Sequence, residues 1–214
     1  MEPSSAPRRA VFLDRDGTII EDADYLTNVD QMRLMPGAAE AIRRLNDAGL
    51  VTVVVTNQSA VARGMMSERA LSAVHEHLRG LLAAHGARVD AIYYCPHHPE
   101  IGDAPYRIAC DCRKPQPGLL RRAAADLTLS LSDSAVIGDS LRDLEAGDAA
   151  GCHTLVLVRT GHGAAEEAAL RAARLTGEAL VCDDLAAAVA LAVSALTPEP
   201  PDDPAGQAAS IDKR

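Results

Sequence analysis

Two runs of consecutive hydrophobic residues constrain the fold more than any other feature of the sequence. The runs are VTVVV, which starts at Val51, and TLVLV, which starts at Thr154, and both are rich in β-branched side chains. A strand that is hydrophobic on both faces is typical of parallel sheets, in which helices cover the two sides. The chain is therefore expected to contain a parallel sheet buried between two layers of helices.

Strand and helix patterns alternate along the chain, which predicts a doubly wound α/β fold with right-handed crossovers. The predicted strands are Ala10–Leu13, Val51–Thr56, Ala91–Tyr94, Ala135–Ile137, Thr154–Val158 and Ala179–Val181. The predicted helices are Ala38–Ala48, Glu68–His85, Gly118–Leu127, Arg142–Ala150, Ala165–Arg174 and Leu185–Ala195. With one Phe and no Trp, the core must be filled by Ala, Val and Leu.

The length of 214 residues fits one domain, which we predict over residues 9–196. Flexible tails are expected at residues 1–8 and 197–214, because the C-terminal sequence TPEPPDDPAGQAASIDKR is rich in Pro, Asp and Gly and poor in hydrophobic residues. The stretches between the first three predicted strands hold only short loops and single helices. No separate cap domain is therefore expected.

The charge and the hydrophobic pattern limit the partners. A net charge of −9 argues against nucleic acid and anionic membranes as partners. The sequence contains no hydrophobic run of the roughly 18 residues that a membrane span needs, and its N-terminus does not resemble a secretory signal. We predict a cytoplasmic monomer with reduced thiols that acts on a small molecule.

Acidic residues follow two predicted strands that end at the same edge of the sheet. Asp14 and Asp16 follow the first strand, and Asp139 follows the fourth. Ligands of open parallel sheets bind at the carboxyl ends of the strands, and oxygen donors without soft ligands suit Mg²⁺. The alternative is a solvated acidic turn at Asp14 and Asp16 and a helix N-cap at Asp139.

Polar and basic residues follow the second and third predicted strands. Thr56 and Asn57 end the second strand, and Arg113 and Lys114 come before Pro115. Hydroxyl, amide and backbone N–H groups can hold phosphate oxygens, and Lys and Arg can neutralise them. The alternatives are ordinary turn chemistry for the first pair and a solvated basic pair for the second.

The segment CPHHPEIGDAPYRIACDC, residues 95–112, concentrates cysteine and histidine. Cys95, Cys110 and Cys112 with one histidine match a closed tetrahedral zinc site. Either His97 or His98 could be the fourth ligand. Four protein ligands leave no open position, so a structural Zn²⁺ is expected, which would fix the loop that ends at Arg113 and Lys114. The alternative is a loop with free cysteines.

Four segments in this order, DRDGT, VVVTN, the Lys of CRKP and GDSLRD, resemble the motifs of the haloacid dehalogenase (HAD) superfamily of phosphohydrolases. The resemblance extends over Ala10 to Val158. More narrowly, FLDRDGTI, VVVTNQS, YYCPHHPE and CDCRKP are similar to the heptose bisphosphate phosphatases, and the histidinol phosphatases are the nearest alternative group. The resemblance implies a capless, three-layer, Rossmann-like α/β/α fold with a zinc-binding loop.

The resemblance also implies the chemistry. Asp14 would be the nucleophile that forms an aspartyl-phosphate, and Asp16 would protonate the leaving oxygen and later activate water. The carboxylates of Asp14 and Asp139 and the main-chain carbonyl of Asp16 would bind Mg²⁺. Thr56 and Lys114 would stabilise the phosphoryl group. The substrate would be a phosphorylated sugar, D-glycero-β-D-manno-heptose 1,7-bisphosphate, on the route to ADP-heptose and the lipopolysaccharide core.

Further roles follow from the same resemblance. His97 would be the zinc-binding histidine. Substrate contacts would come from a group of loop residues that comprises Asp22, Tyr25, Thr56, Asn57, Gln58, Ser59, Arg113 and Lys114.

Two positions depart from the heptose enzymes. Ser140 stands where some of them carry a Lys, so one phosphate contact would be either missing or supplied by Arg142. Ala60 and Val61 replace a Gly-Ile pair. The remaining alternatives are a histidinol-phosphate phosphatase and a catalytically inactive, zinc-stabilised binding domain. The intact set of Asp14, Asp16, Lys114 and Asp139 argues against the inactive domain.

Overall fold

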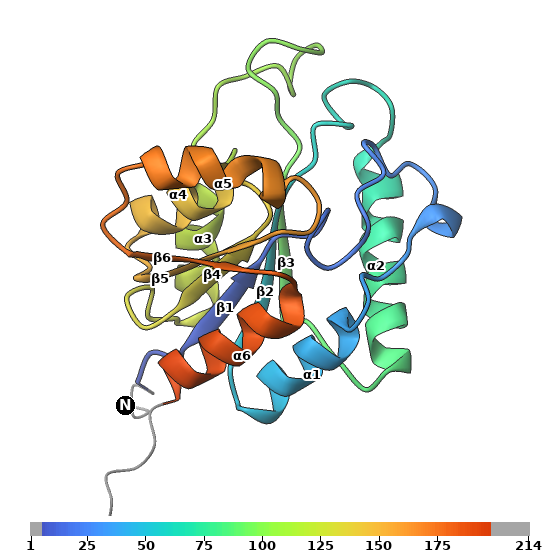
Figure 1. Ribbon diagram of the computed structural model, residues 1–214. Coiled ribbons are helices and arrows are strands. Elements are labelled where there is room, and N and C mark those ends of the chain that lie inside the picture. Colours follow the sequence, from blue (N-terminus) through green and yellow to red (C-terminus); the bar gives the residue numbers. More distant parts are fainter. Residues whose placement is uncertain (1–5, 198–214) are drawn as a thin grey trace, which may run out of the picture.

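The computed structural model describes residues 6–197, which form a six-stranded parallel sheet with the strand order β3-β2-β1-β4-β5-β6 (Figure 1). All five neighbouring strand pairs are parallel. The strands are β1 (Ala10–Leu13), β2 (Val51–Asn57), β3 (Ala91–Cys95), β4 (Ala135–Gly138), β5 (Thr154–Val158) and β6 (Glu178–Cys182). The predicted parallel sheet is confirmed.

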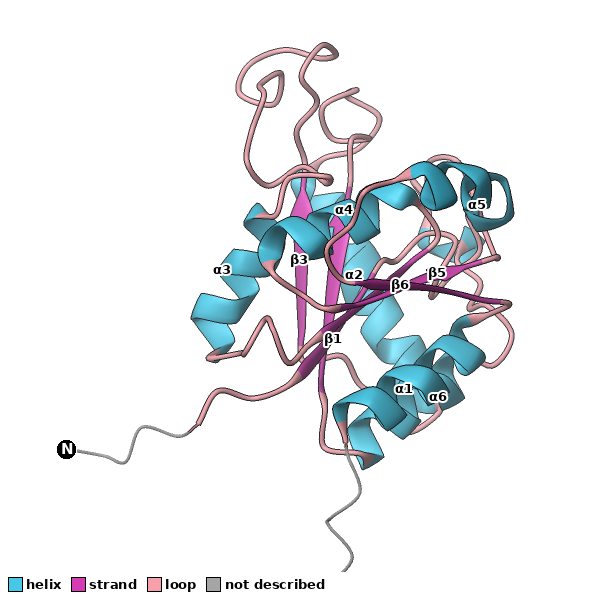
Figure 2. Ribbon diagram, turned by 60° about the vertical axis from the view of Figure 1, so that its left-hand side comes forward, coloured by secondary structure: helices cyan, strands magenta, loops and turns pink. Residues whose placement is uncertain are grey.

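Helices cover both faces of the sheet, as the continuous hydrophobic strands require (Figure 2). One layer contains α1 (Ala38–Asp47), α2 (Glu68–Ala84) and α6 (Leu185–Leu196). The other layer contains α3 (Gly118–Leu127), α4 (Leu141–Ala150) and α5 (Gly163–Ala172). A short 3-10 helix, η1 (Val29–Gln31), was not predicted; Asn28 caps it by accepting the N–H of Asp30.

The core consists of two hydrophobic layers, because alternate residues of each strand face opposite sides. Val11, Leu13 and Val54 pack toward α1, α2 and α6. Phe12, the only phenylalanine of the chain, and Leu155 pack toward α3, α4 and α5. The fold class is therefore a three-layer α/β/α arrangement, as predicted.

The strand order places a topological switch point between β1 and β4. The chain leaves β1 toward β2 and β3 on one side, and it returns to β4, β5 and β6 on the other. Crevices that bind ligands form at such points, outside the carboxyl ends of the strands. The long loops that follow β1, β2 and β3 all project from this edge of the sheet (Figure 1). Within residues 6–197 these loops carry no further folded cap.

The predicted tails lie mostly outside the described residues. Of the first tail, Arg8 is described, and its N–H donates to the carbonyl of Thr128 at 3.0 Å. The chain is thus attached to the domain from Arg8, one residue before the predicted domain start. None of the helices in the part of the chain that the structure describes has the length and apolar character of a membrane span.

Candidate active site

Three buried carboxylates converge at the switch point. Asp14 follows β1, Asp139 follows β4, and Asp143 lies in the first turn of α4. One carboxylate oxygen of each lies within 4.8 Å of those of the other two. Asp14 and Asp139 are therefore close together in the fold, as predicted. Asp143 adds a third carboxylate that the sequence analysis did not single out. Its signal was its place in GDSLRD, four residues after Asp139.

Lys114 lies fully buried between two of these carboxylates. Its Nζ is 2.7 Å from Asp14 Oδ1, 2.7 Å from Asp143 Oδ1 and 2.7 Å from the carbonyl of Val55. Asn57 holds the Lys114 main chain from both sides: its Nδ2 donates to the Lys114 carbonyl, and its Oδ1 accepts the Lys114 N–H, both at 3.0 Å. The end of β2 thus fixes the position of the lysine.

Burial and mutual repulsion perturb these groups. Burial raises the pKa of Asp14 to about 6, and the charges of Asp143 and Asp16 add to the effect, although Lys114 opposes it. Burial together with the charge of Asp14 raises the pKa of Asp139 to about 8. Burial alone would lower the pKa of Lys114, but the charges of Asp14 and Asp143 raise it above its ordinary value. The site therefore holds one fixed cation beside two carboxyl groups, Asp14 and Asp139, that resist ionisation.

This donor set fits a magnesium ion. Lys114 neutralises one of the three carboxylates, and two negative charges are left for a divalent cation. All the donors are hard oxygen ligands, which Mg²⁺ prefers. A bound cation would also offset the burial that raises the pKa values of Asp14 and Asp139. The residues that would hold the ion are Asp14, Asp139 and Asp143.

Two glycines make room for the Asp139 carboxylate. Gly17 has a φ of +76°, and a Cβ at this position would lie 2.2 Å from Asp139 Oδ2. Gly161 has a φ of +55°, and its Cβ would lie 2.1 Å from the same oxygen. That oxygen accepts the N–H of His162 at 2.8 Å. Asp139 is therefore not the helix N-cap of the alternative interpretation; Ser140 occupies that position.

Asp16 lies apart from the three-carboxylate group. Its Oδ2 accepts from Gln58 Nε2 at 2.8 Å, and its Oδ1 accepts from Arg15 Nη2 at 2.9 Å. The side chain lines the pocket but does not belong to the cluster of Asp14, Asp139 and Asp143. Binding of Mg²⁺ through the main-chain carbonyl of Asp16 stays a prediction.

A cavity of about 340 Å³ opens above the carboxylates, and arginines lie along its wall. Arg63, Arg113 and Arg142 all line it, and Arg142 Nε donates to Ser140 Oγ at 2.9 Å. The guanidinium of Arg63 lies 5.3 Å from the ring centre of Tyr25, which is a cation–π distance. Sequence reasoning did not find Arg63, because nothing in the segment SAVARG marks it as close to the site.

The predicted substrate loops line the same cavity, but several of their side chains are already engaged. Asp22 Oδ2 lies 2.9 Å from His162 Nε2. The amide of Asn57 is paired with the Lys114 main chain, and both ends of the Gln58 amide bond to protein atoms. By contrast, the Ser59 hydroxyl takes part in no side-chain hydrogen bond within the described residues.

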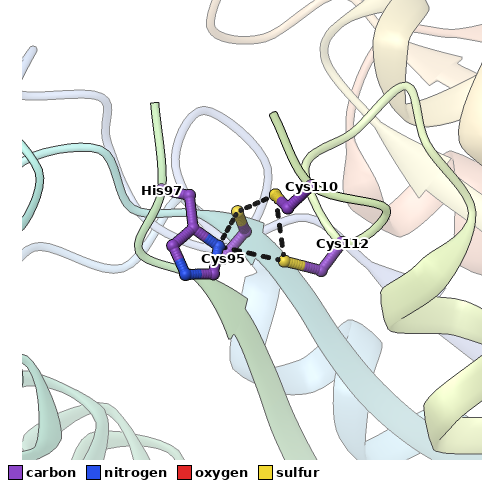
Figure 3. A group of neighbouring side chains, drawn as sticks. All are labelled: Cys95, His97, Cys110 and Cys112. Carbon is purple, nitrogen blue, oxygen red and sulfur yellow. Dashed lines mark hydrogen bonds between the residues drawn. The ribbon is translucent and has the colours of Figure 1, made fainter. Parts of the chain in front are cut away.

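The predicted zinc ligands form one cluster at the end of β3, whose last residue is Cys95 (Figure 3). Cys112 Sγ lies 3.3 Å from Cys110 Sγ and 3.4 Å from His97 Nδ1. Cys95 Sγ lies 3.6 Å from Cys110 Sγ and 3.7 Å from His97 Nδ1. Atoms bound tetrahedrally to zinc at about 2.0–2.3 Å are separated by about 3.5 Å. The four residues therefore fit a structural zinc ion.

His98 has a different role from its neighbour. Its Nδ1 accepts the N–H groups of Glu100 and Ile101, both at 3.1 Å, so the ring stabilises the turn after it. The group of side chains that could hold a metal ion contains His97 and not His98. The choice that the sequence left open thus falls on His97, because the backbone turn engages the other ring.

Several contacts link the cysteine loop to the active site. Arg113 Nη1 donates to the carbonyl of His97 at 3.1 Å. Glu68, the first residue of α2, accepts from Tyr94 at 2.7 Å and from Tyr106 in the loop at 2.8 Å. A Cβ at Gly102 would lie 1.9 Å from the carbonyl of Ala62. The loop is therefore packed against the β2–α2 connection that lines the cavity.

Comparisons with known proteins agree with this geometry. The family described as HAD-hydrolase-like matches residues 111–188. D-glycero-beta-D-manno-heptose-1,7-bisphosphate 7-phosphatase of Photorhabdus laumondii is 45% identical over 152 residues, which cover 71% of this chain and 81% of that protein. The protein of the same name from Escherichia coli K12 is 43% identical over 159 residues, or 74% of this chain and 83% of that one.

Two solved structures extend the likeness to the fold. D,D-heptose 1,7-bisphosphate phosphatase from B. bronchiseptica, complexed with magnesium and phosphate, has a TM-score of 0.74 at 39% identity and covers 86% of this chain and 97% of that one. The enzyme of the same name from Burkholderia thailandensis has a TM-score of 0.64 at 34% identity and covers 87% of this chain and 99% of that one. The chain belongs to the D-glycero-beta-D-manno-heptose-1,7-bisphosphate 7-phosphatase family of HAD-like hydrolases.

Proposed function

We propose that this protein is a Mg²⁺-dependent phosphatase that removes the 7-phosphate of D-glycero-β-D-manno-heptose 1,7-bisphosphate. The observation that carries the proposal is the convergence of Asp14, Asp139, Asp143 and Lys114 at the switch point of the sheet, in a chain of this family. Its product would serve the synthesis of ADP-heptose and of the lipopolysaccharide core.

The side chains divide the reaction into two displacements. A carboxylate oxygen of Asp14 attacks phosphorus, and the bond to the sugar oxygen breaks as that oxygen takes a proton from Asp16. In the second step Asp16 takes a proton from water, the water oxygen attacks phosphorus, and the bond to Asp14 breaks. The products are inorganic phosphate and the 7-hydroxyl sugar, and the enzyme returns to its starting state.

Electrostatic stabilisation comes from fixed positive charge. Lys114 lies 2.7 Å from the Asp14 oxygen and is held by Asn57, so its ammonium is in place before the phosphoryl group arrives. When bound, Mg²⁺ would neutralise phosphoryl charge and orient the group for in-line attack. Thr56 is buried next to Asp16 and would contribute through its hydroxyl.

The arginines of the cavity support a substrate with two phosphates. Arg63, Arg113 and Arg142 line the same cavity as the carboxylates and Lys114. Guanidinium groups bind phosphate oxygens in pairs, which suits the phosphate that is not cleaved. We assign substrate recognition to Arg113 and propose that Arg142 takes over the contact that a Lys at position 140 makes in some relatives. Asp22, Tyr25, Asn57, Gln58 and Ser59 complete the proposed contact region.

The zinc centre is proposed to be structural. Cys95, His97, Cys110 and Cys112 supply four ligands, which fill a tetrahedral shell and leave no position for substrate. The loop has few large hydrophobic side chains, so the ion would replace a small core. We infer that the domain spans residues 9–196 and acts as a cytoplasmic monomer, and light scattering after gel filtration tests the monomer.

A side-by-side assay tests the proposal. Phosphate release is measured with Mg²⁺ from the α and β anomers of heptose 1,7-bisphosphate and from histidinol phosphate. We expect a preference for a heptose bisphosphate, and Asp14→Asn should reduce its turnover to background, because an amide cannot attack phosphorus. Preference for histidinol phosphate would replace the substrate assignment, and turnover by Asp14→Asn would eliminate the aspartyl-phosphate mechanism.

A further inference from the structure

Arg15 lies between the two aspartates of the DRD segment, yet it is fully buried. Its side chain is 1% exposed. It is also the largest of the fully buried side chains in the described part of the chain. Charged side chains are almost never buried without a partner. Here the partner is Asp16: Nη2 lies 2.9 Å from Oδ1, and Nε lies 3.2 Å from both carboxylate oxygens.

Gln58 completes a closed ring of hydrogen bonds around this pair. Its Oε1 accepts from Arg15 Nη2 at 2.9 Å, and its Nε2 donates to Asp16 Oδ2 at 2.8 Å. The same Nε2 donates to Thr56 Oγ1 at 2.8 Å. Arg15, Gln58 and Thr56 are all buried, so water does not compete for these bonds. Both oxygens of Asp16 are thus fixed by the protein.

One further ionisable side chain, His75, lies close enough to feel the charge of the guanidinium. Burial and the charge of Arg15 lower the pKa of His75, on α2, to about 3. The imidazole is therefore neutral at physiological pH and does not repel the guanidinium. It also packs on Tyr94, with ring centres 5.5 Å apart. Asp16 is thus the carboxylate with which Arg15 forms an ion pair.

We propose that Arg15 and Gln58 are positioning residues that hold the Asp16 carboxyl group toward the leaving oxygen and away from the carboxylates that bind the metal. The inference rests on the proposed function and revises the role of Gln58, whose amide is fully used inside the protein and does not contact substrate. Without the hydrogen bonds from Arg15 and Gln58, the Asp16 side chain would be free to turn toward Asp14 and Asp139 and bind the metal. Proton transfer would then lose its donor, whereas the nucleophile would be unaffected.

Substrates with different leaving groups distinguish a role in positioning Asp16 from a general role in stabilising the fold. A sugar alkoxide needs a proton as it departs, but p-nitrophenolate does not. A misplaced Asp16 therefore slows the first step only for the sugar phosphate. It slows hydrolysis of the aspartyl-phosphate for both substrates, because Asp16 activates water in that step.

The test uses stopped-flow and steady-state kinetics of Gln58→Leu, Arg15→Met and Arg15→Lys with heptose bisphosphate and with p-nitrophenyl phosphate. Gln58→Leu and Arg15→Met should lose at least about tenfold in kcat for heptose bisphosphate with little change in KM. With p-nitrophenyl phosphate they should release about one p-nitrophenolate per enzyme in a burst near the wild-type rate, before slow turnover. Arg15→Lys should recover part of the loss, because it keeps the charge but not the planar fork.

Controls keep the outcomes distinct. Arg122→Met, at an exposed position on α3, should match the wild type. A cooperative thermal unfolding transition like that of the wild type shows that a variant is folded, and Gln58→Leu decides the matter if Arg15→Met does not fold. Loss of the burst, or a rise in KM without a change in kcat, would overturn the positioning role. Asp16→Asn should itself show the burst pattern; if it does not, the proposed role of Asp16 fails, and the positioning role with it.

Discussion

Asp143 shows how one residue can serve two partners in the site. Its Oδ1 lies 2.7 Å from Lys114 Nζ, while its Oδ2 accepts the N–H of Ser140 at 3.1 Å and closes the first turn of α4. It is 2% exposed and lies with Asp14 and Asp139 in a group of carboxylates that could hold a metal ion. The residue therefore connects the helix start, the lysine and the proposed metal.

Asp143→Asn should weaken magnesium binding. The amide can still accept the Ser140 N–H, but the site loses one of the negative charges that attract a divalent cation. We expect the Mg²⁺ concentration for half-maximal activity to rise about 10- to 100-fold. Titration of activity with MgCl₂ measures the shift, and Glu145→Gln on the same helix is the matched control. An unchanged Mg²⁺ dependence would remove Asp143 from the metal site.

At the scale of elements, α2 contacts two parts of the chain next to the site, the end of β3 and the cysteine loop. His75 packs on Tyr94 of β3, and Glu68 at the helix start binds the hydroxyls of Tyr94 and Tyr106. The hydrogen bond from Tyr94, and then that from Tyr106, lower the pKa of Glu68, so the carboxylate stays ionised and bound. The helix is thereby attached to both the end of β3 and the cysteine loop.

His75 should make the fold less stable in acid. Its folded pKa of about 3 lies below the unfolded value of 6.5, so the unfolded chain binds a proton that the folded chain does not. Stability should fall by about 1.4 kcal/mol per pH unit from pH 6.5 down toward 3 on account of this group. Urea unfolding at pH 7.5 and 5.5 should show a smaller pH-dependent loss in His75→Leu than in the wild type. The exposed His85→Leu should lose as much as the wild type, and equal losses in all three proteins would contradict the prediction.

Removal of zinc should act on the whole cysteine loop. Because Arg113 bonds to the His97 carbonyl, loosening the loop should displace the end that carries Arg113 and Lys114. Zinc-free protein, verified by metal analysis and assayed at saturating Mg²⁺, should unfold at a lower temperature and lose activity. Cys112→Ser should behave in the same way, whereas Cys182→Ser, outside the cluster, should not. Full activity without zinc would show that the loop holds its shape unaided.

The whole molecule is arranged so that its sheet, rather than any single loop, assembles the site. Asp14, Lys114 and Asp139 come from the connections after β1, β3 and β4. The strand order β3-β2-β1-β4 makes β1 and β4 neighbours and places only β2 between β1 and β3. The close approach of Gly17 and Gly161 to Asp139 depends on the same arrangement, since they lie in the connections after β1 and β5. Small changes in the spacing between these connections should therefore displace the Asp139 carboxylate.

Gly161→Ala tests this tight approach. The new Cβ would meet Asp139 Oδ2 at 2.1 Å and the Gly17 Cα at 2.7 Å, so the carboxylate must move. We expect activity and Mg²⁺ affinity to fall at least about tenfold, as for other losses in metal-site positioning. Gly151→Ala is the matched control: it has a φ of +98° but open space around it, so only stability should fall, by about 1 kcal/mol. Equal activity of the two variants would show that Asp139 tolerates displacement.

The sequence by itself determined the sheet, the order of its elements and most of the chemistry. Continuous hydrophobic runs such as VTVVV can be buried only between two layers, and the carboxyl ends of parallel strands share one edge. The positions of Asp14, Lys114 and Asp139 at that edge followed from local pattern and from motifs. The concentration of cysteine and histidine in one short loop predicted a zinc site with three cysteines and one histidine, and the family resemblance selected His97.

Only the tertiary structure decided how side chains divide their hydrogen bonds. Gln58 is part of a polar segment in the sequence, but in the fold its amide lies between Arg15, Asp16 and Thr56. Asp143 reads as an ordinary helix residue until Lys114, 29 positions earlier, is placed beside it. The physical reason is that a hydrogen bond depends on distances of about 3 Å between atoms far apart in the chain, and local sequence patterns do not contain that information.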